Sequence, residues 1–185
     1  MKHLTEQIAA GEGELGYLES VLAQLAIAGG EPDVGGIRRE LEQTGYIRQQ
    51  GRKGKEKPPE LKPLRFVSSS GVEILVGRNN LQNDRLALKT ARKSDVWLHA
   101  QKIHGAHVVI SCGGAEPDEV TLHEAAAIAA YYSEARRSGK TPVDHTLVRN
   151  VREPAGGQPG MVVYTDQKTI IASPDEALVT RLRRM

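Results

Sequence analysis

Residues 71–110, GVEILVGRNNLQNDRLALKTARKSDVWLHAQKIHGAHVVI, contain most of the distinctive chemistry of this chain. Short apolar runs within them predict strands at 72–76, 96–99 and 107–111. Directly after the first run comes GRNNLQND, residues 77–84, with five amide or carboxylate side chains and one guanidinium. Strand propensity favours none of these residue types. The cluster therefore indicates a role in hydrogen bonding.

The size and composition of the chain limit its class. Its 185 residues, 39% of them hydrophobic, are enough for one domain with a modest core and an appendage. The single cysteine, Cys112, has no disulfide partner and is typical of a reducing compartment. The sequence has no apolar run long enough to span a membrane and no pattern of a secretory signal. We therefore expect a cytoplasmic protein that does not act at a membrane.

Positive charge is concentrated in two stretches, although the net charge is only +2. Residues 48–65 contain seven Lys or Arg and two Glu, and residues 78–102 contain six Lys or Arg and two acids. Such runs are typical either of a solvated linker and helix face or of a surface that binds a polyanion.

Residues 1–48 are predicted to form a helical hairpin that is the remnant of a coiled coil. Apolar residues recur at three- and four-residue spacing from Leu4 to Leu25, as on one face of a helix, and a second helix is predicted at about 34–43. The apolar stripe has no partner within this hairpin. We therefore expect self-association through the N-terminal helix.

Residues 49–63, QQGRKGKEKPPELKP, are predicted to be a basic flexible linker. They have no apolar periodicity and are rich in Gly, Lys and Pro. A linker of this kind predicts that the parts on either side are structurally independent.

Residues 64–178 are predicted to form an α+β domain, and residues 179–185 a basic C-terminal tail. Alternating and apolar runs predict a mainly antiparallel sheet with two packed helices. One helix is expected at about 80–92, and an alanine-rich, buried one at 125–137. A long strand is expected at 143–151.

Catalytic and metal-binding arrangements have weaker support. His99, His104 and His107 are close enough in sequence to ligate zinc across a turn, but no second cluster supplies a further ligand. A nucleophilic pair of Cys112 with one of these histidines is a second alternative. The glycine pairs lack the Lys-Ser/Thr of a phosphate-binding loop. We predict no catalytic activity, metal or cofactor; a metal- or His-dependent hydrolase remains the alternative.

Contact with a nucleic acid fits the residue types better. Amides and guanidinium groups bind phosphate, ribose and base edges, while Trp and His rings stack on unpaired bases. In the alternative interpretation the asparagines cap the next helix and Trp97 is part of the core. The predicted nucleic-acid-binding residues are Arg78, Asn79, Asn80, Gln82, Asn83, Lys89, Arg92, Lys93, Trp97, His99, Lys102, His104, Gly105 and His107.

The motifs, taken together and in order, resemble the NFACT-R domain, the RNA-binding module of the NFACT family. The likeness covers about 64–177, and residues 15–47 resemble the returning end of the family's middle coiled coil. The sequence departs from the family at His104 and Ala106, where Pro and Ser are common. The motifs are GRNNLQND, DVWLHAQ, HGAHVVI, LHEAAAIAAYYSEAR, VDHTLVRNV and GGQPGMVVYTDQKTI.

The resemblance implies a role in ribosome-associated quality control. Members of the family recognise obstructed large ribosomal subunits and recruit tRNA, so that residues, alanine in bacteria, are added to the stalled chain. The NFACT-R domain contacts tRNA near its anticodon arm, and the ribosome supplies the peptidyl-transfer chemistry. The implied partners are tRNA and the rRNA of the large subunit. The family is also associated with fibronectin binding, so an adhesin-type interaction domain is the alternative function.

Overall fold

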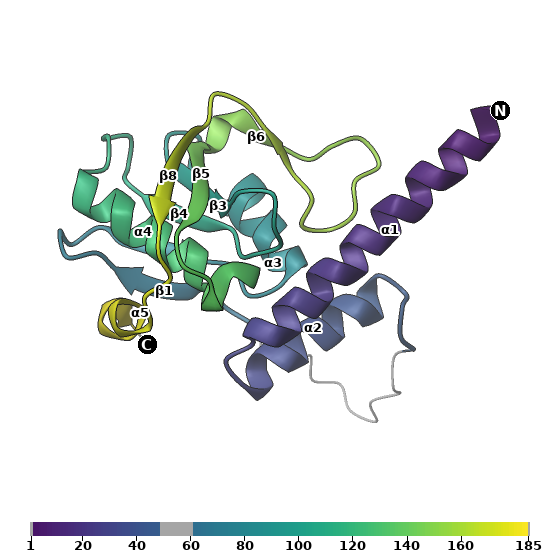
Figure 1. Ribbon diagram of the computed structural model, residues 1–185, viewed down its shortest axis with the longest axis horizontal. Helices are drawn as coiled ribbons and strands as arrows, with labels where there is room; N and C mark the ends of the chain where they lie inside the picture. The colour runs from purple at the N-terminus through teal and green to yellow at the C-terminus, as the bar shows by residue number, and fades with distance from the viewer. Residues whose placement is uncertain (1, 49–60, 185) are drawn as a thin grey trace.

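The computed structural model describes residues 2–48 and 61–184, so most of the expected linker lies outside the described residues. Mixed helix and sheet form the described part, which confirms the predicted fold class (Figure 1). The helical elements are α1 (Lys2–Ile27), α2 (Glu31–Gln43), α3 (Asn80–Asp84), η1 (Arg85–Thr90), α4 (Glu119–Tyr131), η2 (Glu134–Arg137), η3 (Val148–Asn150) and α5 (Glu176–Leu182). The strands are β1 (Leu64–Val67), β2 (Glu73–Val76), β3 (Val96–Ala100), β4 (Val108–Ser111), β5 (Thr141–Leu147), β6 (Val151–Arg152), β7 (Val163–Tyr164), β8 (Lys168–Ala172) and β9 (Arg183–Arg184).

A seven-stranded antiparallel sheet organises the domain. Its strand order is β8-β5-β3-β4-β2-β1-β9, and β6 pairs with β7 in a separate two-stranded ribbon. The central register pairs Trp97 with Val109 on one side and with Thr146 on the other. Because side chains alternate between the two faces of a strand, Val96 and Leu98 face one layer, whereas Trp97 and His99 face the other.

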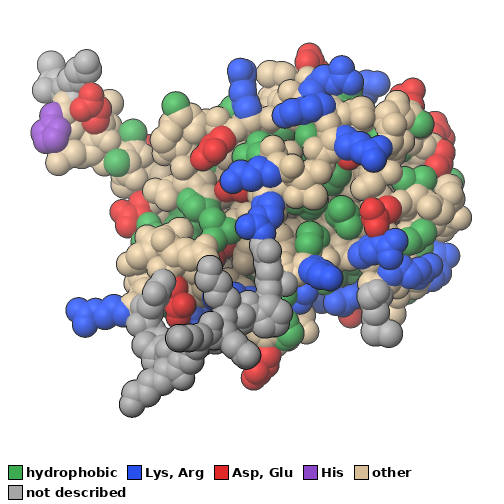
Figure 2. All heavy atoms as spheres, turned by 180° about the vertical axis from the view of Figure 1, so that it is seen from behind, with side chains coloured by type: hydrophobic (Ala, Val, Ile, Leu, Met, Phe, Trp, Pro, Cys, Tyr) green, Lys and Arg blue, Asp and Glu red, His purple; other side chains and the backbone are tan. Residues whose placement is uncertain are grey.

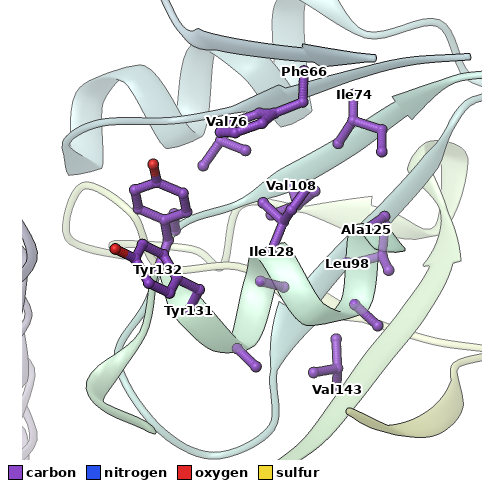
Figure 3. Close-up of a cluster of buried hydrophobic side chains, with 14 of the residues drawn as sticks. Phe66, Ile74, Val76, Leu98, Val108, Ala125, Ile128, Tyr131, Tyr132 and Val143 are labelled. Atoms are coloured by element: carbon purple, nitrogen blue, oxygen red, sulfur yellow. The ribbon is translucent and has the colours of Figure 1, made fainter. Parts of the chain in front are cut away.

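The first face of the sheet packs on α4 through an apolar core (Figure 3). Five of the 13 residues of this helix are alanine, and their short side chains let its backbone approach the strands closely. Ile128 of α4, Leu98 of β3 and Val143 of β5 are fully buried in this core. Each such side chain contributes about 1.5–3 kcal/mol through burial. The prediction of a buried, alanine-rich helix is confirmed, although this helix begins at Glu119 and ends at Tyr131.

The second face is covered by α3, η1 and the β6–β7 ribbon. Its smaller core contains Leu86, Ala87, Trp97 and Val148. The single helix expected at 80–92 is wrong in detail, because it is α-helical only as far as Asp84 and continues as the π-helix η1. In η1, Leu86 and Ala87 face inward and pack in the same core as Trp97.

The loop between β6 and β7, residues 153–162, is called the strap here. It leaves the sheet and reaches toward α1 (Figure 1). The N–H of Gly160 in the strap donates to Asp84 Oδ2 at 3.0 Å. Gly160 has φ of 84°, a conformation that costs glycine little, and a Cβ at this position would overlap the Asn80 side chain.

The end of the described chain differs from the predicted basic tail. Residues 176–182 form α5, whose Val179 and Leu182 are buried in the main core. Residues 183–184 form β9, which pairs with β1 at the edge of the sheet. The three- and four-residue spacing of the apolar side chains in α5 explains why this segment folds onto the domain. The strand expected at 143–151 also breaks, at Leu147, where η3 begins.

Helices α1 and α2 form the predicted hairpin, which is called the arm here (Figure 1). Tyr17 and Val21 of α1 pack on Ile37 of α2. Beside this contact, α1 carries exposed apolar residues at heptad-like spacing, namely Leu4, Ile8, Leu15, Leu18, Leu22 and Leu25. In the described part of the chain, no helix is both long and apolar enough to cross a membrane.

The Asp84 carboxyl gives the domain a specific dependence on pH. Burial raises the pKa of Asp84 from its ordinary value of 3.8 to about 6. The Asp84 carboxyl therefore binds its proton more tightly in the folded state than in the unfolded state. As pH rises from about 4 to about 6, the carboxyl loses this proton and the folded state loses stability. Asp84→Asn removes the charge and keeps an acceptor for Gly160. We expect this variant to be more stable than the wild type at pH 7.5 in urea denaturation, with a gain that shrinks as pH falls from 6 toward 4. A gain that does not change with pH would contradict this assignment.

The exposed stripe of α1 predicts association of two chains. Leu22 is 66% exposed, and burying such side chains between helices releases apolar surface from water. We expect the sedimentation coefficient of the wild type to rise with concentration and that of Leu22→Glu to stay at the monomer value. Val120→Glu changes an exposed apolar residue of α4 and serves as the control that still associates. A wild type that is monomeric at every concentration would show that the stripe does not pair.

Candidate nucleic-acid interface

The sequence cluster at 77–84 lies where the arm meets the sheet domain, and it is called the socket here. Asn80 of the socket is 3% exposed. Its Nδ2 donates to Ser20 Oγ at 2.8 Å and to Glu40 Oε1 at 3.0 Å, while its Oδ1 accepts from Gln24 Nε2 at 2.5 Å. All three partners belong to the arm. In this structure the arm and the sheet domain are therefore in direct contact, contrary to the expectation that the parts on either side of the linker are structurally independent.

A buried carboxylate, Glu40 of α2, is the centre of this junction. Glu40 has no exposed surface, and it accepts hydrogen bonds from Tyr17 Oη at 3.0 Å and from the N–H of Leu81 at 3.3 Å, in addition to Asn80. Burial raises the pKa of Glu40, and these hydrogen bonds act against that rise. Burial also raises the pKa of Tyr17, so its hydroxyl stays a donor.

The other polar residues of the socket are also bonded within the protein. Arg78 Nε pairs with Asp33 of α2. Asn79 caps α3, because its side chain accepts from the N–H of Gln82 at 2.8 Å. Asn83 Oδ1 accepts from the backbone N–H of His107 at 3.1 Å.

The structure therefore does not support the assignment of the socket to RNA contact, which stays a prediction. Asn79, Asn80, Gln82 and Asn83 are buried, and Arg78 is half-buried. A base or phosphate would have to displace internal hydrogen bonds, and a buried polar group left without a partner costs about 1–3 kcal/mol. The alternative interpretation, in which the asparagines cap a helix and hold a turn, describes these residues better.

The predicted stacking residues form an internal aromatic cluster. Trp97 lies parallel to His99, with ring centroids 5.7 Å apart, and edge-on to His107 at 5.3 Å. Tyr164 of β7 closes the cluster at 4.8 Å from Trp97. Trp97 and His107 are buried and His99 is half-buried. The cluster is therefore not accessible to an unpaired base in this conformation, and Trp97 is a core residue.

Burial keeps the imidazoles of this cluster neutral. It lowers the pKa of His107 to about 3 and also lowers the pKa of His99. Neutral rings make no charge contribution to RNA binding. Among the described residues, no group of three or more His, Cys, Asp or Glu side chains is arranged to hold a metal ion.

Asp144 joins the strands around this cluster, a role that the sequence analysis did not find. Its carboxylate accepts from Gln101 Nε2 at 3.0 Å, from Tyr164 Oη at 2.9 Å and from Thr169 Oγ1 at 2.6 Å. Burial, and after it the hydrogen bond to Asp144, raises the pKa of Tyr164 to about 12. The alternation along 143–151 places Asp144 on the Trp97 face, which is the one signal in the sequence for this role.

Five exposed basic side chains lie on adjoining segments and form what is called the basic surface here. Three were predicted, and two from the η3–β6 segment were missed, although one lies within the motif VDHTLVRNV and the other directly follows it. The segments are adjacent, because the N–H of Arg149 donates to the carbonyl of Lys93 at 3.2 Å. The residues are Lys89, Arg92, Lys93, Arg149 and Arg152, all exposed.

A view of one side of the molecule shows Lys and Arg spread over the sheet domain, with fewer Asp and Glu between them (Figure 2). The net charge of the whole chain is only +2, so this face has more positive charge than the chain has on average. Phosphate groups are the natural partners of clustered Lys and Arg side chains.

The loop between β3 and β4 holds the last three predicted residues away from the basic surface. Lys102 is exposed and has φ of 58°. His104 Nε2 lies 3.8 Å from Glu19 Oε2 of the arm. Gly105 packs so closely on Ser133 that a Cβ would lie 2.8 Å from the Ser133 Cβ. This loop follows β3, whereas Arg92 and Lys93 precede it, so the two groups lie at opposite ends of that strand.

Comparison with known proteins gives a consistent family. Residues 62–165 match the model of the NFACT protein RNA binding domain, and residues 1–60 match that of the NFACT N-terminal and middle domains. The Rqc2 homolog RqcH of Bacillus subtilis is 41% identical over 181 residues, which is 97% of this chain and 31% of that protein. Its counterpart in Streptococcus pneumoniae serotype 2 is 42% identical over 185 residues, or all of this chain and 33% of that protein.

The chain thus spans about a third of the length of these curated relatives. A solved structure, the C-terminal part of the fibronectin/fibrinogen-binding protein of Streptococcus suis, superposes with a TM-score of 0.92 at 39% identity. The match covers 99% of this chain and 72% of the other. The family model and these likenesses together cover both the arm and the sheet domain, and we conclude that the chain belongs to the NFACT family and carries its RNA-binding domain.

Proposed function

We propose that this chain is the tRNA- and rRNA-binding module of a factor in ribosome-associated quality control. The observation that carries the proposal is the basic surface on a domain of an RNA-binding family. The names of the RqcH relatives support the same process. In this proposal the whole protein binds an obstructed large subunit and recruits tRNA for alanine tailing of the stalled chain.

In this proposal the basic surface binds the sugar–phosphate backbone. Lys and Arg position a nucleic acid through its phosphates, and base contacts add specificity. The predicted base-contacting residues of the socket and the aromatic cluster are internal, so the described surface supplies mainly charge. Selection among tRNAs then depends on the shape of the folded RNA, which proteins read through its backbone.

The proposed role needs no chemistry from the chain itself. Binding and positioning a tRNA leaves peptidyl transfer to the ribosome, so we propose a binding protein rather than an enzyme. It also needs no metal, cofactor or membrane. Because the proposed partner is the ribosome, we propose that the protein acts in the cytoplasm.

Binding of an extracellular matrix protein is the second candidate. One observation favours it, namely the likeness to the C-terminal part of a fibronectin/fibrinogen-binding protein. Such binding would use apolar and hydrogen-bonding contacts, which salt weakens little. The dependence of binding on salt, measured for fibronectin and for tRNA side by side, therefore separates the two candidates.

The basic surface predicts a steep dependence of tRNA binding on salt. Each neutralised phosphate releases counterions and contributes about 0.7–0.9 to the slope of log K against log salt. We expect Arg92→Ala and Arg149→Ala each to weaken binding of all tRNAs and to lower this slope by about one. Filter binding at several NaCl concentrations measures both quantities.

The matched control is Lys140→Ala. Lys140 is exposed and directly precedes β5, at the same end of the sheet as Lys102 because Ala100 pairs with Val143. It has the same charge as the tested residues, and its replacement should leave the slope unchanged. Equal effects of all three substitutions would show that binding follows net charge, and no effect from any of them would exclude the basic surface.

A further inference from the structure

Asn80 contacts two segments that are far apart in the sequence. On one side its amide is bonded to Ser20, Gln24 and Glu40 of the arm. On the other side it lies against the strap, since a Cβ on Gly160 would overlap Asn80 Oδ1, Cγ and Cβ. The same side chain therefore holds the arm and forms the seat for the strap.

The strap depends on this seat. Gly160 is held by its bond to Asp84 Oδ2, while Asp84 Oδ1 is buried and finds no partner among the described residues. Beyond Gly160, Val162 and Tyr164 pack on the core that contains Trp97. If Gly160 moves, Val162 loses the anchor that keeps it over this core, whereas Tyr164 keeps its hydrogen bond to Asp144.

The orientation of the Asn80 amide depends in turn on the arm. Its three hydrogen bonds to side chains all end on arm residues. If the arm moves away, the amide exchanges these three fixed partners for water and is free to rotate about its side-chain torsions. On the domain side Asn80 lies directly against Gly160, so a rotated amide meets the strap backbone.

We propose that Asn80 is a positioning residue that couples the arm to the strap. With the arm docked, the amide is fixed and Gly160 is seated against it. With the arm displaced, the amide rotates, Gly160 leaves its seat and the strap opens over Trp97. Coupling of this kind is reciprocal, so a change in the strap also loosens the arm.

The strap begins directly after Arg152, a member of the basic surface. If the proposed function is correct, RNA bound at this surface influences the arm through the strap and Asn80. The coupling itself does not rest on RNA binding, because all of its contacts lie within the chain. It can therefore be measured without RNA, and its failure would leave the proposed function untouched.

Hydrogen exchange of the whole chain, followed by mass spectrometry, tests the coupling. Glu40→Ala removes the arm's central acceptor, and we expect exchange in strap peptides to rise several-fold while β3 and β4 stay protected. Arg38→Ala is the control, because Arg38 lies on the same helix in an exposed pair with Glu42; it should leave the strap unchanged. If Glu40→Ala also exposes β3 and β4, the milder Ser20→Ala takes its place with the same expectation.

The reciprocal test starts from the strap. Gly160→Ala places a methyl group against Asn80 and strains the backbone at φ of 84°. We expect faster hydrogen exchange in α1 around Tyr17–Gln24, a segment that is far from the strap in the sequence. A variant whose strap loosens while α1 exchanges as in the wild type would overturn the proposal, as would a loosened arm with an unchanged strap.

Discussion

A carboxyl group buried away from water has to keep its hydrogen bonds, because leaving such a group without a partner costs about 1–3 kcal/mol, and more where it is charged. Glu40 is in this situation, and its partners come from α1, from the socket and from the start of α3. This single requirement fixes the position of the arm, the orientation of Asn80 and the direction in which α3 leaves β2. The socket is polar because it serves a buried charge.

The two faces of the sheet are built by different means. The α4 face is apolar throughout, and small alanine side chains allow close packing there. The Trp97 face combines aromatic rings with buried polar groups, including Asp144 and His107. The first face supplies most of the apolar burial, and its close packing tolerates little change in side-chain volume. The second holds segments together by hydrogen bonds with defined directions, and the strap covers it. The arm meets the strap at Asn80 and also reaches the first core through Ile27.

The sequence was sufficient for the fold class, because period-two alternation and the alanine-rich helix are strong local signals. It also located the chemically distinctive residues, since GRNNLQND is out of place after a strand. It did not reveal their role, because an asparagine that binds RNA and one that binds a buried glutamate have the same local pattern. Glu40 lies far from Asn80 in the sequence, and no local signal joins them. The π-helix of η1 and the pairing of β9 with β1 likewise depend on tertiary contacts rather than on propensity.

The edge of the sheet has a consequence for how the domain is made. β1 can pair with β2 once both have been synthesised. The other edge of β1 pairs with β9, where Arg65 lies opposite Arg184, and β9 is made last. While the intervening chain is still being translated, the backbone N–H and C=O groups along that edge are unpaired, and an open edge strand is a template for pairing with other chains. A domain for which we propose a role in the rescue of stalled translation is thus itself vulnerable whenever its own synthesis stalls before α5 and β9.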